Sequence, residues 1–147
     1  MKCETFHTQS EDETLALGQK LASELPPKAV ILLIGELGAG KTTLAKGIVK
    51  GLGAARPEEV SSPTFTLVHE YGRSVYHIDL YRLDSAKQVA TIGLDEILER
   101  PATVLIEWGE RFPRLMPDQR IEIRLRATGE NSREIEIRDL GGVLRKP

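Results

Sequence analysis

The stretch from Gly35 to Thr42 places the strongest constraint on the fold of this chain, because it matches the spacing G-x-x-x-x-G-K-[ST] in full. In such a loop the glycines let the backbone turn with its N–H groups pointing into one concavity, which suits phosphate oxygens. Lys41 adds a positive charge that reaches the β- and γ-phosphates, and the Thr42 hydroxyl can bind Mg²⁺. We therefore expect a nucleotide to contact Gly35, Glu36, Leu37, Gly38, Ala39, Gly40, Lys41, Thr42 and Thr43.

The residues on both sides of this loop decide whether the match is meaningful. Residues 29–34 are an uninterrupted apolar run of strand length, and Leu44, Ile48 and Leu52 recur at one-turn spacing after the loop. A buried strand, a glycine loop and an amphipathic helix are what a phosphate-binding loop requires. A glycine-rich turn without a ligand is the alternative, but such a turn would not need a lysine and a threonine at these positions.

Composition limits the class of protein. The 147 residues are 40% hydrophobic and 29% charged, which suits one globular domain over residues 1–147. No apolar run approaches the roughly 20 residues of a membrane span, and the N-terminus lacks a signal-peptide core, so we expect a cytoplasmic protein that does not bind a membrane. The single cysteine, Cys3, excludes an internal disulfide and a metal site built from cysteines.

Charge is nearly balanced over the chain but uneven along it. The net charge of −2 argues against binding of nucleic acid by the free protein. Most of the arginines lie at or after Arg111, where they alternate with glutamates such as Glu122 and Glu134. A solvated sheet face is one interpretation of this region, and a docking surface for an acidic partner is the other.

The order of predicted elements around the loop is mixed. Before it, residues 5–8 predict a short edge strand, and a helix is expected from the capping box Ser10–Glu13 to Leu25. After it, residues 65–71 and 74–80 read as two strands joined by so short a turn that they must be antiparallel.

The second half of the chain predicts two short helices, a buried strand and a terminal hairpin. The helices are expected over residues 86–92 and 94–99, and the apolar run 102–106 reads as a strand. Apolar and charged residues alternate over 120–127 and again over 134–138, which indicates two strands with one buried face. Together the elements predict an α/β fold: a single P-loop NTPase domain with a mixed β-sheet, an antiparallel hairpin insertion and flanking helices.

Acids at strand ends are the candidates for catalysis, because ligands of open α/β sheets bind beyond the C-terminal ends of the parallel strands. Glu107 follows the run 103–106 and is the candidate Mg²⁺ ligand, directly or through water. Asp79 would orient the attacking water or hold a metal-bound water; a role as a turn or N-cap residue is the alternative. Thr64 either senses the γ-phosphate or is an ordinary turn residue.

Aromatic and histidine residues near these acids give weaker signals. Trp108, the only tryptophan, adjoins Glu107 and either walls the nucleotide site or packs in the core. His69 and His77 have no metal-ligand spacing, so we interpret both as structural. The sequence shows no clear Ser/His/Asp or Cys/His nucleophile system.

Four motifs, taken together and in this order, resemble the TsaE (YjeE) family, the small bacterial ATPases of tRNA threonylcarbamoyladenosine biosynthesis. The motifs are Gly35 to Thr43, Ser62-Pro63-Thr64-Phe65-Thr66-Leu67-Val68, Tyr76-His77-Ile78-Asp79-Leu80-Tyr81-Arg82-Leu83 and Ile106-Glu107-Trp108. The resemblance runs from about Glu11 to Arg138. Many families share the phosphate loop, whereas S-P-T-F and H-x-D-L-Y-R are much more selective.

The resemblance implies a P-loop fold that binds ATP and ADP, with Mg²⁺ at Thr42 and Glu107 and an essential aspartate at Asp79. It implies weak hydrolysis by the isolated protein, expected to be a monomer, and association with the TsaB–TsaD complex. TsaD attaches the threonylcarbamoyl group to adenosine in tRNA, and the ATP cycle would reset the complex between turnovers. Contact with tRNA would be indirect, through the complex. From their positions alone, Glu11 and Arg133 are also expected to border the nucleotide.

Two other functions remain open at this point. A small-molecule kinase would need an acceptor pocket and an arginine-bearing lid, for which residues 111–114 are the candidate. A nucleotide-gated binding module without productive hydrolysis is the other, although the intact Glu107 and Asp79 argue against it. A small GTPase is not expected, because no guanine-reading N-K-x-D motif occurs late in the chain.

Overall fold

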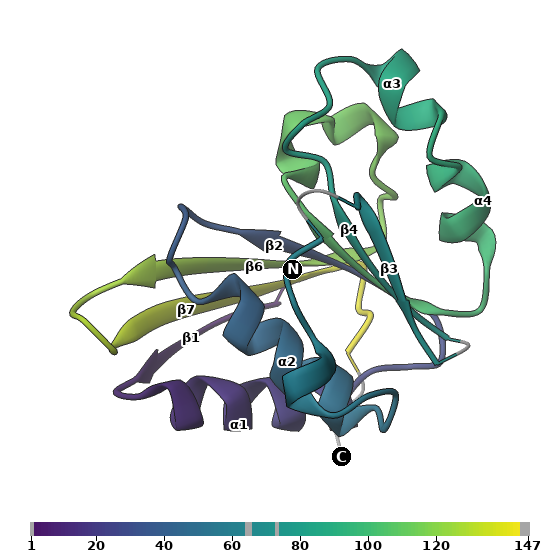
Figure 1. Ribbon diagram of the computed structural model, residues 1–147. Coiled ribbons are helices and arrows are strands. Elements are labelled where there is room, and N and C mark those ends of the chain that lie inside the picture. The colour runs from purple at the N-terminus through teal and green to yellow at the C-terminus, as the bar shows by residue number, and fades with distance from the viewer. Residues whose placement is uncertain (1, 64–65, 73, 145–147) are drawn as a thin grey trace.

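The computed structural model describes residues 2–63, 66–72 and 74–144, which form a seven-stranded sheet (Figure 1). The strands are β1 Lys2–Thr8, β2 Ala29–Ile34, β3 Val68–Tyr71, β4 Val75–Asp79, β5 Thr103–Glu107, β6 Arg120–Ala127 and β7 Arg133–Leu140. Their order in the sheet is β1-β7-β6-β2-β5-β4-β3. The central strands β6, β2, β5 and β4 are parallel, and the outer strands pair antiparallel with their neighbours. The mixed sheet with an antiparallel β3–β4 hairpin confirms the predicted fold class.

Helices cover both faces of this sheet. They are α1 Glu11–Ser23, α2 Lys41–Gly51, α3 Ala86–Ala90 and α4 Leu94–Glu99, with short 3₁₀ turns η1 Pro57–Glu59, η2 Gly109–Arg111 and η3 Pro113–Leu115. Figure 1 shows α1 and α2 together on one side of the sheet and α3 and α4 on the other. Within the described ranges, none of the helices combines the length and apolar character that crossing a membrane requires.

Strand β2 lies at the centre of the core, and all of its residues are buried. Ile31 and Leu33 pack into the apolar layer that includes Leu44 of α2. Leu32 faces the opposite layer, which includes Leu94 of α4. A strand covered on both faces reads as a continuous apolar run, which is why the sequence predicted it well.

Glycines bring α1 and α2 into backbone contact. A Cβ on Gly47 would lie 2.1 Å from the carbonyl oxygen of Leu15, and a Cβ on Gly18 would lie 2.6 Å from that of Leu44. Larger side chains therefore cannot occupy these positions unless the helices move apart. Because α2 directly follows the phosphate loop, this close packing helps to fix where the loop ends.

The strand predicted over residues 65–71 is shorter in the structure. β3 begins at Val68, because Leu67 adopts a positive φ of 68° and donates its N–H to the Pro63 carbonyl. Phe65 lies outside the described residues. The short edge strand expected near the N-terminus is present and pairs with β7 along its whole length.

Ion pairs run along the C-terminal hairpin of β6 and β7. Arg120 Nε lies 2.8 Å from Glu122 Oε2, and Arg138 Nε lies 2.7 Å from Glu136 Oε1. The positive charges of these arginines are therefore matched by glutamates on the same strands. This arrangement favours a solvated sheet face over a docking surface for an acidic partner.

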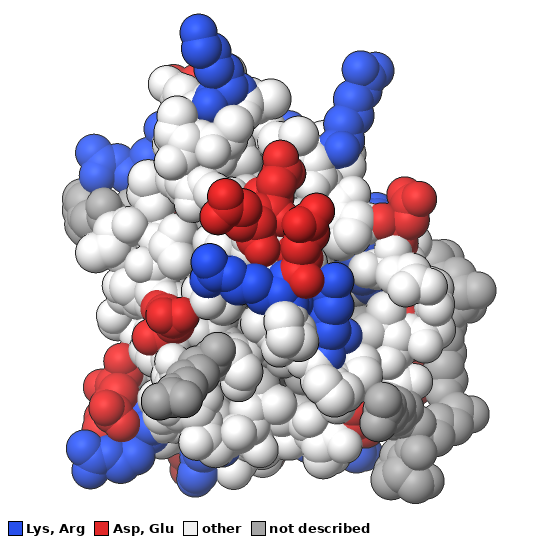
Figure 2. All heavy atoms as spheres, turned by 90° about the vertical axis from the view of Figure 1, so that its right-hand side faces the viewer, with Lys and Arg blue, Asp and Glu red and all other residues white. Residues whose placement is uncertain are grey.

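Charges of both signs are also mixed on the side of the molecule that carries α4. Asp95, Glu96 and Glu99 of this helix are exposed. Figure 2 views this side and shows acidic side chains gathered near its centre, with Lys and Arg side chains beside them. Among the residues drawn in colour, this face has no broad basic surface of the kind that binds nucleic acid backbones.

Candidate nucleotide-binding site

A cleft of about 820 Å³ opens at the C-terminal end of the parallel strands, in front of the loop between β2 and α2. The residues that line it are Glu11, Glu36, Leu37, Gly38, Gly40, Lys41, Thr42, Thr43, Ser62, Asp79, Tyr81, Glu107, Trp108 and Arg133. The structure thus brings together most of the site residues that the sequence predicted. Gly35 and Ala39 are not among the lining residues, and Thr64 lies outside the described part of the chain.

Gly35 and Ala39 support the phosphate loop from behind. Ala39 is buried. A Cβ on Gly35 would lie 2.6 Å from the carbonyl oxygen of Leu125 in β6. The glycine is needed for this close approach of the loop to the neighbouring strand, so its role in the structure is to seat the loop against the sheet.

The backbone of the loop is shaped to receive an anion. Gly38 and Gly40 have φ angles of 82° and 102°, a left-handed conformation that favours glycine. No atom of the described protein lies within 4 Å of a Cβ built on Gly38, so the loop is open on that side. Gly40 caps α2 without a side-chain hydrogen bond, which leaves the first N–H groups of the helix facing the cleft.

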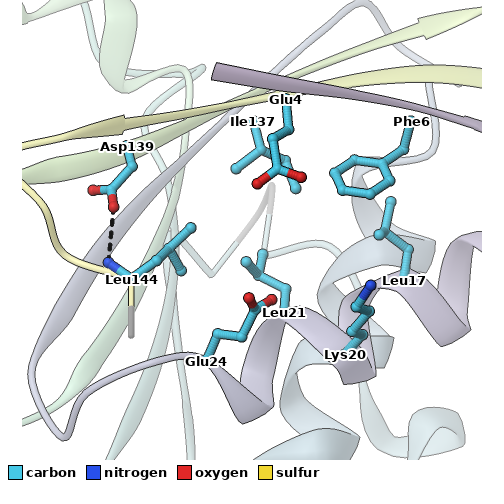
Figure 3. Close-up of a pocket in the computed structure, with 9 residues that line it drawn as sticks. All are labelled: Glu4, Phe6, Leu17, Lys20, Leu21, Glu24, Ile137, Asp139 and Leu144. Atoms are coloured by element: carbon cyan, nitrogen blue, oxygen red, sulfur yellow. Dashed lines mark hydrogen bonds between the residues drawn. The ribbon is translucent and has the colours of Figure 1, made fainter. Parts of the chain in front are cut away.

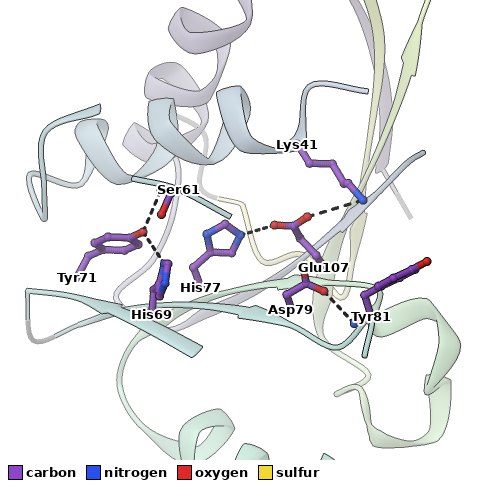
Figure 4. Close-up of polar contacts among 8 residues, drawn as sticks. All are labelled: Lys41, Ser61, His69, Tyr71, His77, Asp79, Tyr81 and Glu107. Carbon is purple, nitrogen blue, oxygen red and sulfur yellow. Dashed lines mark hydrogen bonds and ion pairs between the residues drawn. The ribbon is translucent and has the colours of Figure 1, made fainter. Parts of the chain in front are cut away.

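Lys41, Glu107 and His77 form a buried chain of polar contacts (Figure 4). Lys41 Nζ lies 3.7 Å from Glu107 Oε1, and His77 Nε2 lies 2.7 Å from Glu107 Oε2. Glu107 is only 3% exposed and His77 is completely buried. A carboxylate taken out of water needs partners of this kind, and here each of its oxygens has one.

Asp79 lies beside Glu107, since the two residues are paired in the register of β4 and β5. Asp79 Oδ1 accepts a hydrogen bond of 2.8 Å from the Tyr81 N–H, which fixes the carboxylate within a turn. The side chain is 3% exposed and also lines the cleft. The two interpretations of Asp79, as a turn residue and as a site residue, are therefore compatible.

Aromatic rings form one wall of the cleft. The Lys41 ammonium lies 4.5 Å from the ring centroid of Trp108, a cation–π contact. The Tyr81 and Trp108 rings are 5.2 Å apart, and Tyr81 is 55% exposed. Trp108 thus walls the site, which was one of its two predicted roles.

Arg133 ties the start of β7 to the phosphate loop. Its Nη2 donates to the Gly38 carbonyl at 3.1 Å, and its Nη1 donates to the Ser132 carbonyl at 2.8 Å. Glu11, in the first turn of α1, lines the cleft as well. Both residues therefore lie at the cleft, as predicted from the sequence, and Arg133 also holds the loop itself.

A profile of a known family matches this chain. The family is described as "Threonylcarbamoyl adenosine biosynthesis protein TsaE", and the match covers residues 8–135. The chain belongs to the TsaE family. This confirms the resemblance carried by the four motifs and places the chain in a family of tRNA threonylcarbamoyladenosine biosynthesis.

Individual relatives agree with the family match. The chain is 37% identical over 144 residues to the tRNA threonylcarbamoyladenosine biosynthesis protein TsaE of Bacillus subtilis, covering 96% of this chain and 89% of the relative. It is 45% identical over 134 residues to the protein of the same name from Nostoc sp. strain PCC 7120, covering 86% and 80%. The crystal structure of Bacillus subtilis YdiB matches with a TM-score of 0.78 and 33% identity, covering 95% of this chain and 87% of that one.

The donor groups of this TsaE-family cleft suit a magnesium nucleotide. No group of three or more His, Cys, Asp and Glu side chains that could hold a metal ion occurs among the residues described by the structure. Mg²⁺ at nucleotide sites, however, uses one or two carboxylates together with substrate phosphates. The Thr42 hydroxyl and the Glu107 carboxylate both line the cleft, so the residues present fit such an ion.

Sequence reasoning missed the roles of His77, Tyr81 and Ser62. Tyr81 and Ser62 line the cleft. His77, interpreted as structural, is buried as expected, but it contacts Glu107. One signal was present: His77 and Asp79 are two residues apart on one strand, so their side chains share a face. That face could be connected to Glu107 only once β4 was known to lie next to β5.

A second, much smaller pocket lies between β1, α1 and β7 (Figure 3). Its volume is about 50 Å³, and its walls include Phe6, Leu17 and Ile137. Asp139, at its rim, already accepts a hydrogen bond of 2.9 Å from the Leu144 N–H. The pocket is too small for a nucleotide and lacks a phosphate-binding loop, so it does not compete with the cleft.

Proposed function

We propose that this TsaE-family chain is a Mg²⁺-dependent ATP hydrolase that serves the threonylcarbamoyladenosine modification of tRNA. The observation that carries the proposal is the convergence of Lys41, Glu107 and Asp79 in one cleft, directly in front of the phosphate loop. Binding of phosphate alone would not need two buried carboxylates there. A carboxylate for the metal ion and a second one for the attacking water are what ATP hydrolysis requires.

Each residue has a role in this proposal. The N–H groups of the loop and of the first turn of α2 bind the phosphates, and Lys41 adds its charge to the same oxygens. Thr42 and Glu107 hold Mg²⁺, which would neutralise negative charge on the phosphates. Asp79 orients the attacking water or holds a metal-bound water. Thr64 as a sensor of the γ-phosphate stays a prediction.

The Lys41–Glu107 contact suggests how the chain responds to its ligand. Lys41 lies 3.7 Å from Glu107 and 4.5 Å from the ring centroid of Trp108. Phosphate oxygens compete with Glu107 for the ammonium group, because they carry more negative charge. If Lys41 turned to the phosphates, Glu107 Oε1 would be available to hold the metal ion or a water bound to it.

The partner in this proposal is a TsaB–TsaD complex, which ATP hydrolysis would reset between turnovers. The names of the relatives, which place them in tRNA threonylcarbamoyladenosine biosynthesis, support a role in the same pathway. At the cleft mouth, Leu37 is 99% exposed and Tyr81 is 55% exposed. We expect the complex to cover these two side chains. Contact with tRNA would be indirect, through the complex.

The test is the rate of Mg-ATP hydrolysis by the purified chain, alone and with a TsaB–TsaD complex from the same source. We expect slow turnover by the chain alone and clear stimulation by the complex. No turnover in either sample would contradict the hydrolase assignment. Turnover without stimulation would contradict the partner, and the assay would then be repeated with small-molecule phosphoryl acceptors.

The kinase alternative is the weaker one. Arg111, in the segment considered as a lid, donates from Nη1 to the Tyr81 carbonyl at 2.8 Å and lies 3.8 Å from the Asp84 carboxylate. These contacts hold Arg111 against the loop after β4, and Arg111 is not among the residues that line the cleft. A lid arginine would instead reach toward the transferred phosphate.

A further inference from the structure

We infer that His77 is a positioning residue that orients Glu107 for the magnesium nucleotide. The inference rests on the proposed function and adds to it a residue that does not line the cleft. The sequence motifs gave this histidine no role in the site. Three observations support this role: the contact itself, the burial of both partners, and the separate partners of the two Glu107 oxygens.

The contact with Glu107 indicates which ring nitrogen of His77 carries a hydrogen. A carboxylate only accepts hydrogen bonds, so His77 Nε2 is the donor in its 2.7 Å contact with Glu107 Oε2. His77 Nδ1 is buried and has no hydrogen-bond partner among the described residues. A ring nitrogen that carries no hydrogen tolerates such a site better than an N–H group would. The ring therefore presents one donor, and that donor is directed at Glu107.

The sheet places His77 behind Glu107, where its ring contacts one of the two carboxylate oxygens. In the register of β4 and β5, His77 pairs with Leu105 and Asp79 pairs with Glu107. His77 thus lies one pleat back from the strand ends, behind Glu107. Figure 4 shows the carboxylate between its two partners, with His77 on one side and Lys41, which lines the cleft, on the other. His77 holds the inner oxygen, so the outer oxygen faces the nucleotide.

This arrangement matters most after the nucleotide has bound. Lys41 then turns to the phosphates, and the hydrogen bond from His77 is what still holds a carboxylate that is only 3% exposed. A buried carboxylate that loses a partner costs free energy until it finds another. Without His77, the Glu107 carboxylate would lose the hydrogen bond at Oε2 that fixes its rotation, which would leave the metal ligand without a fixed direction. Partners of metal ligands typically change metal affinity or activity by about 10- to 100-fold.

Four variants separate this role from a general effect on folding. His77→Leu removes the donor and keeps an apolar side chain at a buried position. His77→Gln keeps one N–H donor near the Nε2 position and loses only the unpartnered Nδ1. His77→Asn is too short to place a donor there. His69→Leu is the matched control, because His69 pairs with His77 across the β3–β4 hairpin and contacts Tyr71 instead of Glu107.

The first readout does not depend on turnover. Trp108 is the only tryptophan, and it lies against Lys41, so its fluorescence should report on the site. With ADP bound, Mg²⁺ is titrated into each folded variant. We expect the Mg²⁺ concentration at half-effect to rise about 10- to 100-fold in His77→Leu. The Mg²⁺ concentration at half-effect should change less than about threefold in His77→Gln and in His69→Leu. The affinity for ADP without Mg²⁺ should change less than about threefold in every variant.

The second readout is steady-state hydrolysis of ATP. In His77→Leu we expect kcat to fall about tenfold or more, with recovery to within about threefold of wild type in His77→Gln. An unchanged Mg²⁺ dependence in folded His77→Leu would overturn the inference, and so would equal losses in His77→Leu and His77→Gln. If His77→Leu does not fold, the comparison of His77→Asn with His77→Gln decides in the same way.

The two proposals can fail separately. If the wild-type chain binds Mg-ADP but hydrolyses no ATP, alone or with its partners, the hydrolase assignment fails, and the fluorescence titration still decides the role of His77. If the wild-type chain hydrolyses ATP and the variants that lack the donor, His77→Leu and His77→Asn, keep normal Mg²⁺ dependence, the hydrolase assignment stands and the positioning role is wrong.

Discussion

Three groups compete for the buried ammonium group of Lys41. It lies 3.7 Å from a Glu107 oxygen and 4.5 Å from the ring of Trp108, and the proposed phosphates would be the third. The residue is 7% exposed, so it cannot exchange these partners for bulk water. Its free energy of interaction with Glu107 must therefore be outweighed by that with phosphate for a nucleotide to bind.

Lys41→Met tests this competition. Hydrogen bonds to charged groups contribute about 1.5–3 kcal/mol, so the affinity for ADP, measured by calorimetry, should fall about 10- to 100-fold. Lys50→Met, at an exposed position in the last turn of α2, is the matched control and should leave the affinity unchanged. Equal affinities of wild type and Lys41→Met would show that the lysine does not bind the nucleotide.

We expect the stability of the folded protein to depend on pH through Glu110. Burial raises the pKa of this carboxyl above its ordinary value of 4.5, against the opposing effects of a backbone hydrogen bond and the charge of Lys41. One of its oxygens is buried without a hydrogen-bond partner among the described residues. Since the folded state binds the proton more tightly than the unfolded state does, the stabilisation from this group is complete below 4.5 and is lost as pH rises through the raised pKa.

Glu110→Gln removes that loss, because the amide stays neutral. We expect the variant to have a higher free energy of unfolding than wild type at about pH 8, with the difference shrinking toward about pH 4. Urea unfolding at both pH values measures it, with Glu96→Gln on the exposed side of α4 as the control. A difference that is the same at both pH values would contradict the burial of a charged carboxylate at Glu110.

Among the helices and strands, the contact between α1 and α2 should affect both the free energy of unfolding and nucleotide binding. Gly47→Ala would place a Cβ 2.1 Å from the Leu15 carbonyl oxygen, a distance that the helices can relieve only by separating. We expect a loss of about 2–3 kcal/mol in the free energy of unfolding, together with weaker nucleotide binding, because α2 begins in the phosphate loop. Lys50→Ala, on the exposed side of the same helix, should change stability by less than about 0.5 kcal/mol. A stable Gly47→Ala variant would mean that the helices are not tightly packed.

Strands with a regular pattern of apolar residues could be predicted from the sequence. A strand end that is set by an unusual backbone conformation could not. The run of β2 is buried on both faces, and the β6–β7 hairpin alternates along both strands, so both were predicted correctly. The start of β3 was placed too early, because the positive φ of Leu67 ends the extended chain and nothing in its side chain indicates this. At Leu67 the backbone conformation therefore ended a strand that the side-chain pattern had predicted to continue.

Over the whole molecule, the order of strands decides which residues meet. β5 lies between β2 and β4, although it follows both in the sequence, and this order brings Glu107 beside Asp79 and the phosphate loop. The acids themselves were predictable, since each ends an apolar run. The contact of His77 with Glu107 was not predictable, because it crosses from β4 to β5. Arg133 was expected at the site from its position alone, but its contact with Gly38 was not predicted, since it reaches the loop from the far end of the chain.

The most direct test of the account compares the rate of single-turnover ATP hydrolysis in wild type, Asp79→Asn and Asp95→Asn. Asparagine can still accept the Tyr81 N–H bond through its side-chain oxygen, so the turn and the affinity for Mg-ADP should be preserved. Asp95 lies on the exposed side of α4 and serves as the control. We expect Asp79→Asn to bind Mg-ADP normally and to hydrolyse ATP about 100-fold more slowly, while Asp95→Asn matches wild type. Hydrolysis by Asp79→Asn at the wild-type rate would contradict it.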